Sequence, residues 1–190
     1  MKQAPVLTER DAKRVLNHCK QTAFPDRNRC VFMLGYLAGM RIGEIAALKV
    51  GDVLTAEGEV RASIQLTAEQ TKGSEARTVL LNAQSQEELR GYLDRLPEVA
   101  KAPASSLITS KTGKRFSGNG LCQLMLKLYD DAGLDRATSH STRRTFITTL
   151  AHKGVNVRVL AALAGHKSIA TTQRYIDLND NVLRAAVEMI

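Results

Sequence analysis

The spacing of apolar residues predicts a chain that is mostly helical. Thr8 occupies a helix N-cap position with Asp11 three residues later, a pair that starts helices. Gly39 follows a strongly apolar segment and predicts its end, because glycine adopts the left-handed conformation that closes helices. From such signals we expect a short helix with Glu44, Ile45 and Leu48, and longer helices over residues 9–20, 27–38, 83–95, 120–132, 141–153, 157–164, 169–177 and from about 180.

Residues 50–82 break this helical pattern. Glycines punctuate two β-like runs, at 60–66 and 76–81. The turn between them, residues 70–74, places Lys72 at or near the tip of a hairpin. The expected fold class is therefore α/β (α+β), mostly helical with a small antiparallel β-sheet. Because no repeat, low-complexity tract or dividing linker is visible, the chain is expected to form a single domain.

Composition and charge point to a polyanionic partner. Hydrophobic residues make up 44% of the 190 residues, so a core can form, but aromatic residues make up only 4%. Aromatic platforms for single-stranded nucleic acid are therefore not expected. The formal net charge is +8, and residues 101–175 carry twelve Lys or Arg against three Asp. A solvated basic surface is the simpler explanation, but we favour binding of nucleic acid.

The cysteines and the apolar runs exclude several other classes. The three cysteines form no CxxC pair, and their odd number argues against a disulfide framework. Cys30 and Cys122 stand in apolar helical runs and are expected to fill the core. We expect no metal site and no cofactor, because neither clustered ligands nor a GxxxxGK[ST] loop is present. The run 31–40 is too short to span a membrane and no signal peptide is visible, so a cytoplasmic protein is expected.

Four segments together carry a specific pattern of chemistry-bearing residues. They are GMRIGEIAAL (39–48), TKGSEARTV (71–79), SHSTRRTF (139–146) and AGHKSIATTQRYI (164–176). In content and order they resemble the tyrosine recombinases of the phage integrase type. That family's pattern is an Arg with an acid at +3, a Lys on a β-hairpin, a His-x-x-Arg box, a Gly-His and a Tyr nine residues later. Here it falls on Arg41 with Glu44, Lys72, His140 with Arg143, His166 and Tyr175.

The resemblance implies that the chain, residues 1–190, is a catalytic domain that cuts and rejoins DNA through Tyr175. Attack on a phosphodiester would leave a 3′-phosphotyrosyl link and a free 5′-hydroxyl. Charge then develops on the non-bridging oxygens, and planar guanidinium groups such as those of Arg41 and Arg143 suit its stabilisation. Neither ATP nor a metal is needed, since the bond energy is retained in the ester.

The remaining roles follow from the same resemblance. It gives His140 a general-base or phosphate-contact role and His166 a phosphate-contact role. Lys72 is the expected acid for the leaving 5′ oxygen. Glu44 is expected to orient Arg41 or a nearby histidine.

Double-stranded DNA is the partner that the resemblance implies. We expect a homo-tetramer on paired DNA sites, and a monomer or weak oligomer without DNA. Residues 179–190 have an apolar face that packs on its own domain or docks on a neighbouring protomer. Most family members also carry an N-terminal clamp domain, for which this chain has no room, so it is either naturally short or a fragment. The residues expected to contact DNA are Lys111, Lys114, Arg115, Arg144, Lys167 and Arg174.

Two alternatives share part of this pattern. A type IB topoisomerase uses the same chemistry without exchanging strands, but the Gly-His-to-Tyr spacing favours a recombinase. A DNA-binding regulator without catalysis could have the same fold, but the intact set of catalytic-type residues argues against it. The sequence specifies neither the DNA target nor a choice among integration, excision, inversion and dimer resolution, because phosphate contacts carry no base information.

Overall fold

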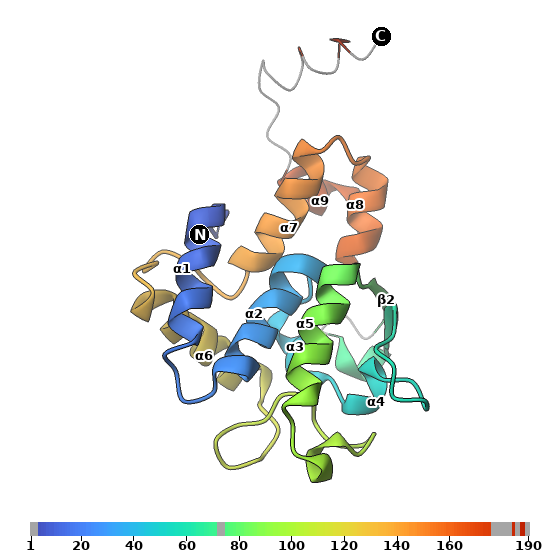
Figure 1. The fold of residues 1–190 in the computed structure, drawn as a ribbon. Coiled ribbons are helices and arrows are strands. Elements are labelled where there is room, and N and C mark those ends of the chain that lie inside the picture. The colour runs from blue at the N-terminus through green and yellow to red at the C-terminus, as the bar shows by residue number, and fades with distance from the viewer. Residues whose placement is uncertain (1–3, 72–74, 176–183, 185–186, 189–190) are drawn as a thin grey trace.

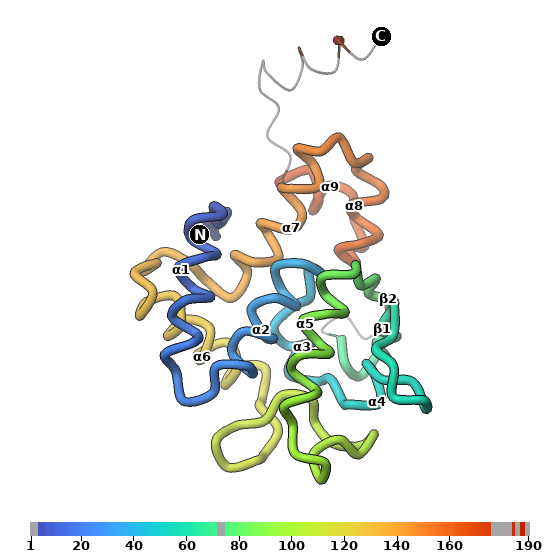
Figure 2. Tube along the Cα trace, viewed as in Figure 1, coloured from blue at the N-terminus to red at the C-terminus, as the bar shows by residue number. Residues whose placement is uncertain are grey.

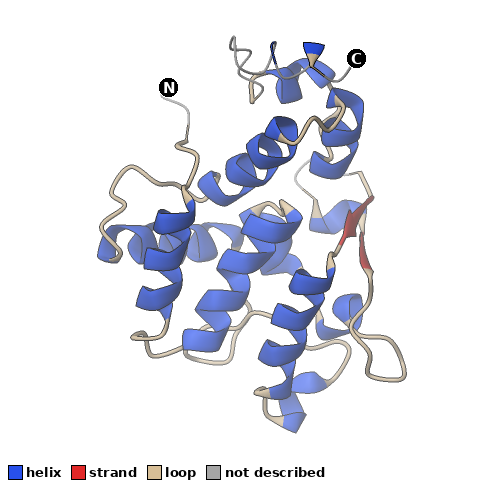
Figure 3. Cartoon of the chain, turned by 45° about the horizontal axis from the view of Figure 1, so that its top comes forward, coloured by secondary structure: helices blue, strands red, loops and turns tan. Residues whose placement is uncertain are grey.

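The computed structural model describes residues 4–71, 75–175, 184, 187 and 188. Helices dominate these residues, and a single pair of strands lies at one edge of them (Figures 1 and 3). The helices are α1 (Glu9–Cys19), α2 (Pro25–Ala38), α3 (Ile42–Ala47), α4 (Val50–Val53), α5 (Ala83–Asp94), α6 (Gly118–Asp131), α7 (Ser141–His152), α8 (Val157–Ala164) and α9 (Ile169–Gln173). The strands are β1 (Ser63–Leu66) and β2 (Arg77–Leu80), and the 3-10 helices are η1 (Ala68–Gln70) and η2 (Glu98–Lys101).

Helix α2 forms the centre of the core. It lies between α1 and α5 (Figures 1 and 3) and also packs against α3 and α7. Most of its residues are buried, as expected of the apolar run that begins at Cys30 and makes up most of the helix. Phe32 is fully buried and meets the ring of Tyr129 from α6 edge-on, with ring centroids 6.4 Å apart.

The expected small antiparallel sheet is confirmed. Strands β1 and β2 pair with Ile64 opposite Val79, and both side chains are buried. The strands are shorter than predicted, because Val60 forms only an isolated bridge with Leu54 before the ladder begins. Lys72, expected near the tip of the hairpin, lies outside the described residues.

Other expectations need correction or stay open. Cys30 is buried as expected, but Cys122 is only half-buried, and its Sγ donates to the Ser139 hydroxyl at 3.2 Å. The expected helix over 169–177 is observed only as far as Gln173, and most of the expected final helix lies outside the described residues. Among the described residues, no helix combines the length and the apolar character needed to cross a bilayer.

Helices α7, α8 and α9 gather at one end of the molecule, and the segment between η2 and α6 lies at the other (Figures 1 and 2). The two ends are connected through α2, since α7 packs on α2. Gly39 closes α2 with a left-handed φ of 62°, as predicted from the sequence. It also lies directly under the ring of Phe146 on α7. The junction between α2 and α3 therefore depends on a residue without a side chain.

This junction gives a test of stability. Gly39→Ala should lower the free energy of unfolding by about 2–3 kcal/mol, because its methyl group would be held at positive φ and would overlap the Phe146 ring. Gly43→Ala is the matched control, since Gly43 is exposed in α3 and an added methyl group meets nothing within 4 Å. The control should be neutral or stabilising by about 0.5 kcal/mol. Urea denaturation measures both, and equal midpoints for the two variants would contradict the prediction.

Candidate active site

Three arginine side chains from separate parts of the chain meet at the C-terminal end of α8. Each guanidinium donates a hydrogen bond to a different backbone carbonyl. The last carbonyls of a helix have no partner within it and carry partial negative charge, which makes them natural acceptors for cations. The pairs are Arg77 with Leu163 (3.0 Å), Arg143 with Ala164, and Arg41 with Gly165 (2.9 Å).

A buried carboxylate, that of Glu44, connects two of these arginines. It is 1% exposed and accepts from Nη1 of Arg41 at 2.7 Å and from Nε and Nη2 of Arg77 at 3.0 and 2.7 Å. Burial by itself would raise the pKa of Glu44, but the hydrogen bonds and charge of Arg77, joined by those of Arg41, outweigh it and lower the pKa. Glu44 is therefore charged at neutral pH, and the three arginines keep an excess of positive charge.

Local sequence explains why Arg41 and Glu44 meet. The left-handed Gly39 turns the chain at the end of α2, and Arg41 becomes the N-cap residue of α3. Glu44 is then the third residue of that helix, where its carboxylate also accepts from the Arg41 backbone N–H at 2.8 Å. The Arg-x-x-Glu spacing is thus a helix-capping geometry, and it confirms that Arg41 has the acidic partner expected from sequence.

Arg143 is the most deeply buried of the three arginines, at 4% exposure. It lies on α7, and its Nη1 donates to the Gly39 carbonyl at 2.7 Å. Burial, and then the positive charges of Arg41 and Arg77, lower the pKa of Arg143 to about 9. The guanidinium remains charged at neutral pH and is held in place by two backbone carbonyls.

His166 and Tyr175 complete the cluster. Gly165 closes α8 with φ 59°, and His166 follows it directly. The imidazole stacks on the ring of Tyr175, with centroids 5.8 Å apart and planes 19° from parallel. Burial, followed by the charges of Arg143, Arg41 and Arg77, lowers the pKa of His166 to about 4. The imidazole is therefore neutral at pH 7.

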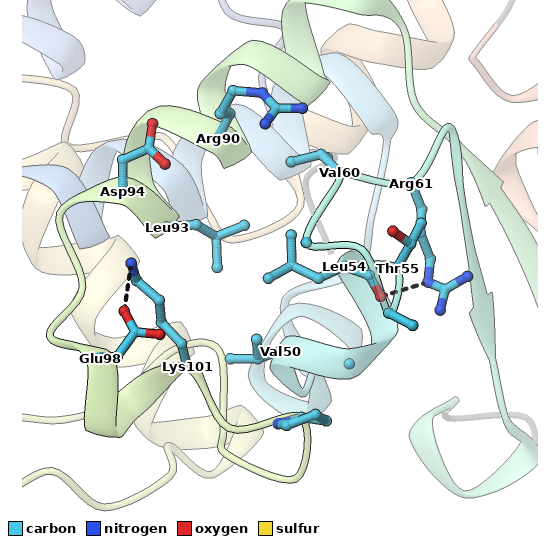
Figure 4. Close-up of a pocket in the computed structure, with 14 residues that line it drawn as sticks. Val50, Leu54, Thr55, Val60, Arg61, Arg90, Leu93, Asp94, Glu98 and Lys101 are labelled. Carbon is cyan, nitrogen blue, oxygen red and sulfur yellow. Dashed lines mark hydrogen bonds and ion pairs between the residues drawn. The ribbon is translucent and has the colours of Figure 1, made fainter.

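Part of this cluster lines an open groove of about 490 Å³ between β2 and the α8–α9 segment, and Arg143 and Tyr175 lie behind its lining residues, in contact with Ala164 and His166. Its lining includes Arg41, Arg77, His166 and Lys167. A larger hollow, of about 570 Å³, has an apolar floor that includes Val50, Leu54, Val60 and Leu93 (Figure 4). None of the residues predicted to act on DNA lines that hollow. The groove is therefore the candidate active site.

The two other predicted catalytic residues are Lys72 and His140. Lys72 lies outside the described residues. His140 is the exposed N-cap residue of α7, three positions before Arg143. Among the described residues, no group of three or more His, Cys, Asp or Glu is arranged to hold a metal ion.

The six residues expected to contact DNA fall into two groups. Lys111, Lys114 and Arg115 lie in the segment between η2 and α6, at the end of the molecule away from α7–α9 (Figure 1). All three are exposed, and Nε of Arg115 also donates to the Ala46 carbonyl at 3.1 Å.

The second group comes from α7 and from the segment that follows α8, and of its members Lys167 lines the groove. Arg174 is exposed, and Lys167 forms an ion pair of 2.7 Å with Glu75. Arg144 is half-buried; its Nη1 donates to the Ala4 carbonyl at 2.7 Å, and its guanidinium carbon lies 5.9 Å from the centroid of the Tyr175 ring.

Sequence reasoning missed Arg77, although a signal for it was present. Side chains alternate between the two faces of a strand, so Arg77 shares a face with Val79, which is buried. An arginine on the buried face of a strand needs an acidic partner, and here the partner is Glu44. Arg77 also favours glycine at position 165, because a Cβ there would lie 2.6 Å from the Cδ of Arg77. Arg77 therefore positions both Glu44 and the end of α8.

Comparison with known proteins places this cluster in context. The model of the phage integrase family matches residues 5–182. The tyrosine recombinase XerD of Corynebacterium glutamicum is 34% identical over 160 residues, which cover 83% of this chain and 50% of that protein. This chain therefore spans about half the length of that curated relative.

Solved structures share the fold. The crystal structure of XerA recombinase has a TM-score of 0.76 and 29% identity, covering 100% of this chain and 65% of that one. The Tn1549 transposon integrase, solved in complex with a circular intermediate DNA, has a TM-score of 0.77 at 19% identity, covering 100% of this chain and 67% of that one. The second likeness shows the fold alone. The predicted fold class is confirmed.

The Glu44 ion pairs predict a pH-dependent stability. At pH 7, Glu44→Gln should lower the free energy of unfolding by about 3 kcal/mol, because it leaves buried guanidinium groups without their carboxylate. The folded pKa of Glu44 lies below its ordinary value of 4.5. Its stabilisation is thus fully present above that pH and is lost as the pH falls through the folded pKa. Urea denaturation between pH 7 and pH 3 should show the difference between wild type and variant shrinking below pH 4.5.

The matched control for this prediction is Glu59→Gln. Glu59 is 66% exposed in its ion pair with Arg90, so its loss should change stability by less than about 1 kcal/mol. A Glu44→Gln deficit that is as large at pH 3 as at pH 7 would show that its cause is not the carboxylate charge.

Proposed function

The chain belongs to the phage integrase family, and from that premise we propose that it is the catalytic part of a tyrosine-type site-specific DNA recombinase. The observation that carries the proposal is one cluster, in which Arg41, Arg143 and His166 gather beside the ring of Tyr175. Their order in the sequence is that of the family, and their chemistry suits a phosphodiester. Relatives named tyrosine recombinases support the same activity.

In this proposal the groove binds one DNA phosphate. Arg41 and Arg143 are already fixed by backbone carbonyls and by Glu44, so little reorganisation is needed when negative charge develops on the phosphate oxygens. A guanidinium has five N–H donors, so each arginine keeps donors for the phosphate while it holds the protein. The neutral His166 adds a hydrogen bond without adding charge.

Tyr175 is the proposed nucleophile. Its Oη forms a bond to phosphorus while the bond from phosphorus to the 5′ oxygen breaks. The phenolic proton passes to a base, the proposed role of His140, and the leaving 5′ oxygen takes a proton from Lys72. A 5′-hydroxyl of another strand then attacks the 3′-phosphotyrosine, which restores the phosphodiester and the free tyrosine.

Double-stranded DNA is the proposed substrate and partner. The excess of Lys and Arg over residues 101–175 supports it, as does the solved complex of the Tn1549 integrase with DNA. Assembly into a tetramer on paired sites, with residues 179–190 docking on a neighbouring protomer, is part of the same proposal. Lys111 and Lys114 would then meet phosphates beyond the cleavage site, because they lie at the far end of the molecule from α7–α9.

Covalent trapping tests the nucleophile. Wild-type protein incubated with a library of nicked duplexes should form adducts that survive denaturation, and Tyr175→Phe should reduce them to background while DNA affinity stays within about twofold. The substitution keeps the ring that stacks on His166 and removes only the oxygen.

Wild-type adducts should also form in EDTA, because in this mechanism arginines rather than a metal ion stabilise the negative charge of the phosphate. Sequencing of the trapped DNA identifies the target.

The control for this substitution is Tyr36→Phe. Tyr36 is half-buried and its ring stacks on Phe32 at 5.5 Å, so the loss of its hydroxyl should leave trapping unchanged. Adducts that persist in Tyr175→Phe would refute the assignment. DNA binding by wild type without any adduct would favour a regulator, and relaxation of supercoiled DNA without strand exchange would favour a topoisomerase.

The salt dependence of DNA affinity tests the proposed phosphate contacts of Lys111 and Lys114. Each phosphate contact adds about 0.9 to the slope of log affinity against log salt. Changing Lys111 and Lys114 together to Ala should therefore reduce the slope by about 1.8. The control changes Lys13, on α1, and Lys20, at the C-terminal end of α1, to Ala. Both lysines are exposed, so this double variant loses the same net charge as the Lys111 and Lys114 variant. Equal slopes for the two double variants would remove this segment from the DNA interface.

A further inference from the structure

The two ring nitrogens of His166 have different surroundings. Nδ1 lies 2.9 Å from the hydroxyl oxygen of Thr172, on α9. Thr172 is 0% exposed, although its neighbours Thr171 and Gln173 are exposed. Nε2 lies on the far side of the ring from this contact, and His166 itself lines the groove. One nitrogen is thus bound inside the protein, and the other is available for a ligand.

Burial of the Thr172 hydroxyl decides which atom donates in this hydrogen bond. In the part of the chain that the structure describes, this hydroxyl has one hydrogen-bonding partner, Nδ1 of His166. If Nδ1 carried a proton and donated it, the hydroxyl proton would be left buried without an acceptor, which is costly. If the hydroxyl donates instead, Nδ1 accepts and every polar atom is satisfied. The neutral imidazole then carries its proton on Nε2.

Thr172 also stabilises the backbone turn that ends at Tyr175, the proposed nucleophile. Its carbonyl accepts a hydrogen bond from the Tyr175 backbone N–H at 2.9 Å. The same residue therefore fixes the tautomer of His166 and begins the turn that stacks the Tyr175 ring on that imidazole. The surrounding arginines keep the imidazole neutral, since their charges lower the pKa of His166.

We propose that Thr172 is a positioning residue that holds His166 in the Nε2–H tautomer, so that the imidazole donates a hydrogen bond to a phosphate oxygen in the groove. The identity of that acceptor rests on the proposed function. The tautomer does not, because it follows from contacts within the protein.

Histidine nitrogen NMR tests the tautomer directly. In ¹⁵N-histidine-labelled protein at pH 7, the His166 signals should show a protonated Nε2 and an unprotonated Nδ1. The chain has four histidines, so one His166→Gln spectrum assigns the signals. Thr172→Val, which keeps the shape and removes the hydroxyl, should give a mixture of tautomers. Thr172→Ser should restore the wild-type pattern.

Covalent trapping tests whether the tautomer matters for the reaction. Thr172→Val should slow adduct formation about tenfold, as expected for one hydrogen bond lost in the transition state, and Thr172→Ser should recover most of the rate. Thr149→Val is the control, because Thr149 is an exposed threonine on α7 that does not line the groove, and its rate should stay at the wild-type value.

The outcomes separate this inference from the proposed function. A protonated Nδ1 of His166 in the wild-type spectrum would overturn the inference, and this result does not depend on whether Thr172→Val folds. Normal trapping by a Thr172→Val protein with mixed tautomers would overturn its role in the reaction. If wild-type protein forms no adduct while Nε2 is protonated and Thr172-dependent, the proposed function fails and the tautomer assignment stands.

Discussion

Three consecutive carbonyls at the C-terminal end of α8 accept hydrogen bonds from Arg77, Arg143 and Arg41. These arginines come from β2, from α7 and from the turn before α3, so the helix end joins three parts of the chain that are otherwise separate. Cations gathered this closely repel one another, and the partial negative charge of the helix end offsets part of that repulsion. The positions of these three arginines therefore depend on where α8 stops.

Two further features maintain this arrangement. Glu44 supplies the full negative charge that the helix end lacks, and its burial strengthens each of its hydrogen bonds. Gly39 and Gly165, both at positive φ, end α2 and α8, so that Arg41 follows two residues after the first glycine and His166 directly after the second. The chemistry of the groove is thus held by helix ends rather than by long loops. This explains why residues separated by more than a hundred positions can occupy fixed places.

Features that depend on neighbours in sequence could be predicted. The Thr8–Asp11 cap, the end of α2 at Gly39 and the bounds of α8 are local, and all agree with the structure. Features that depend on tertiary contacts could not. The short helix α4 lies in the region where the helical pattern was expected to break, and Cys122 was expected in the core but is only half-buried. Arg77 was overlooked although its alternation with Val79 in the strand indicated a buried face, whereas a lone threonine such as Thr172 carries no signal until the buried partner beside it is known. Family resemblance singled out Arg41, Arg143, His166 and Tyr175, which the structure brings together, but the groups that hold them are visible only in three dimensions.

The long separation between Arg41 and its carbonyl partner also has a consequence for biosynthesis. Contacts that span most of a chain form late in folding, because the intervening residues must be ordered first. A nascent chain that has emerged only as far as α7 already contains Arg41, Glu44, Arg77 and Arg143. It still lacks the carbonyls that gather the guanidinium groups, and it lacks the tyrosine. In the proposed mechanism, reactivity toward a phosphodiester would therefore appear only when α8, α9 and the turn that carries Tyr175 have docked on the rest of the chain.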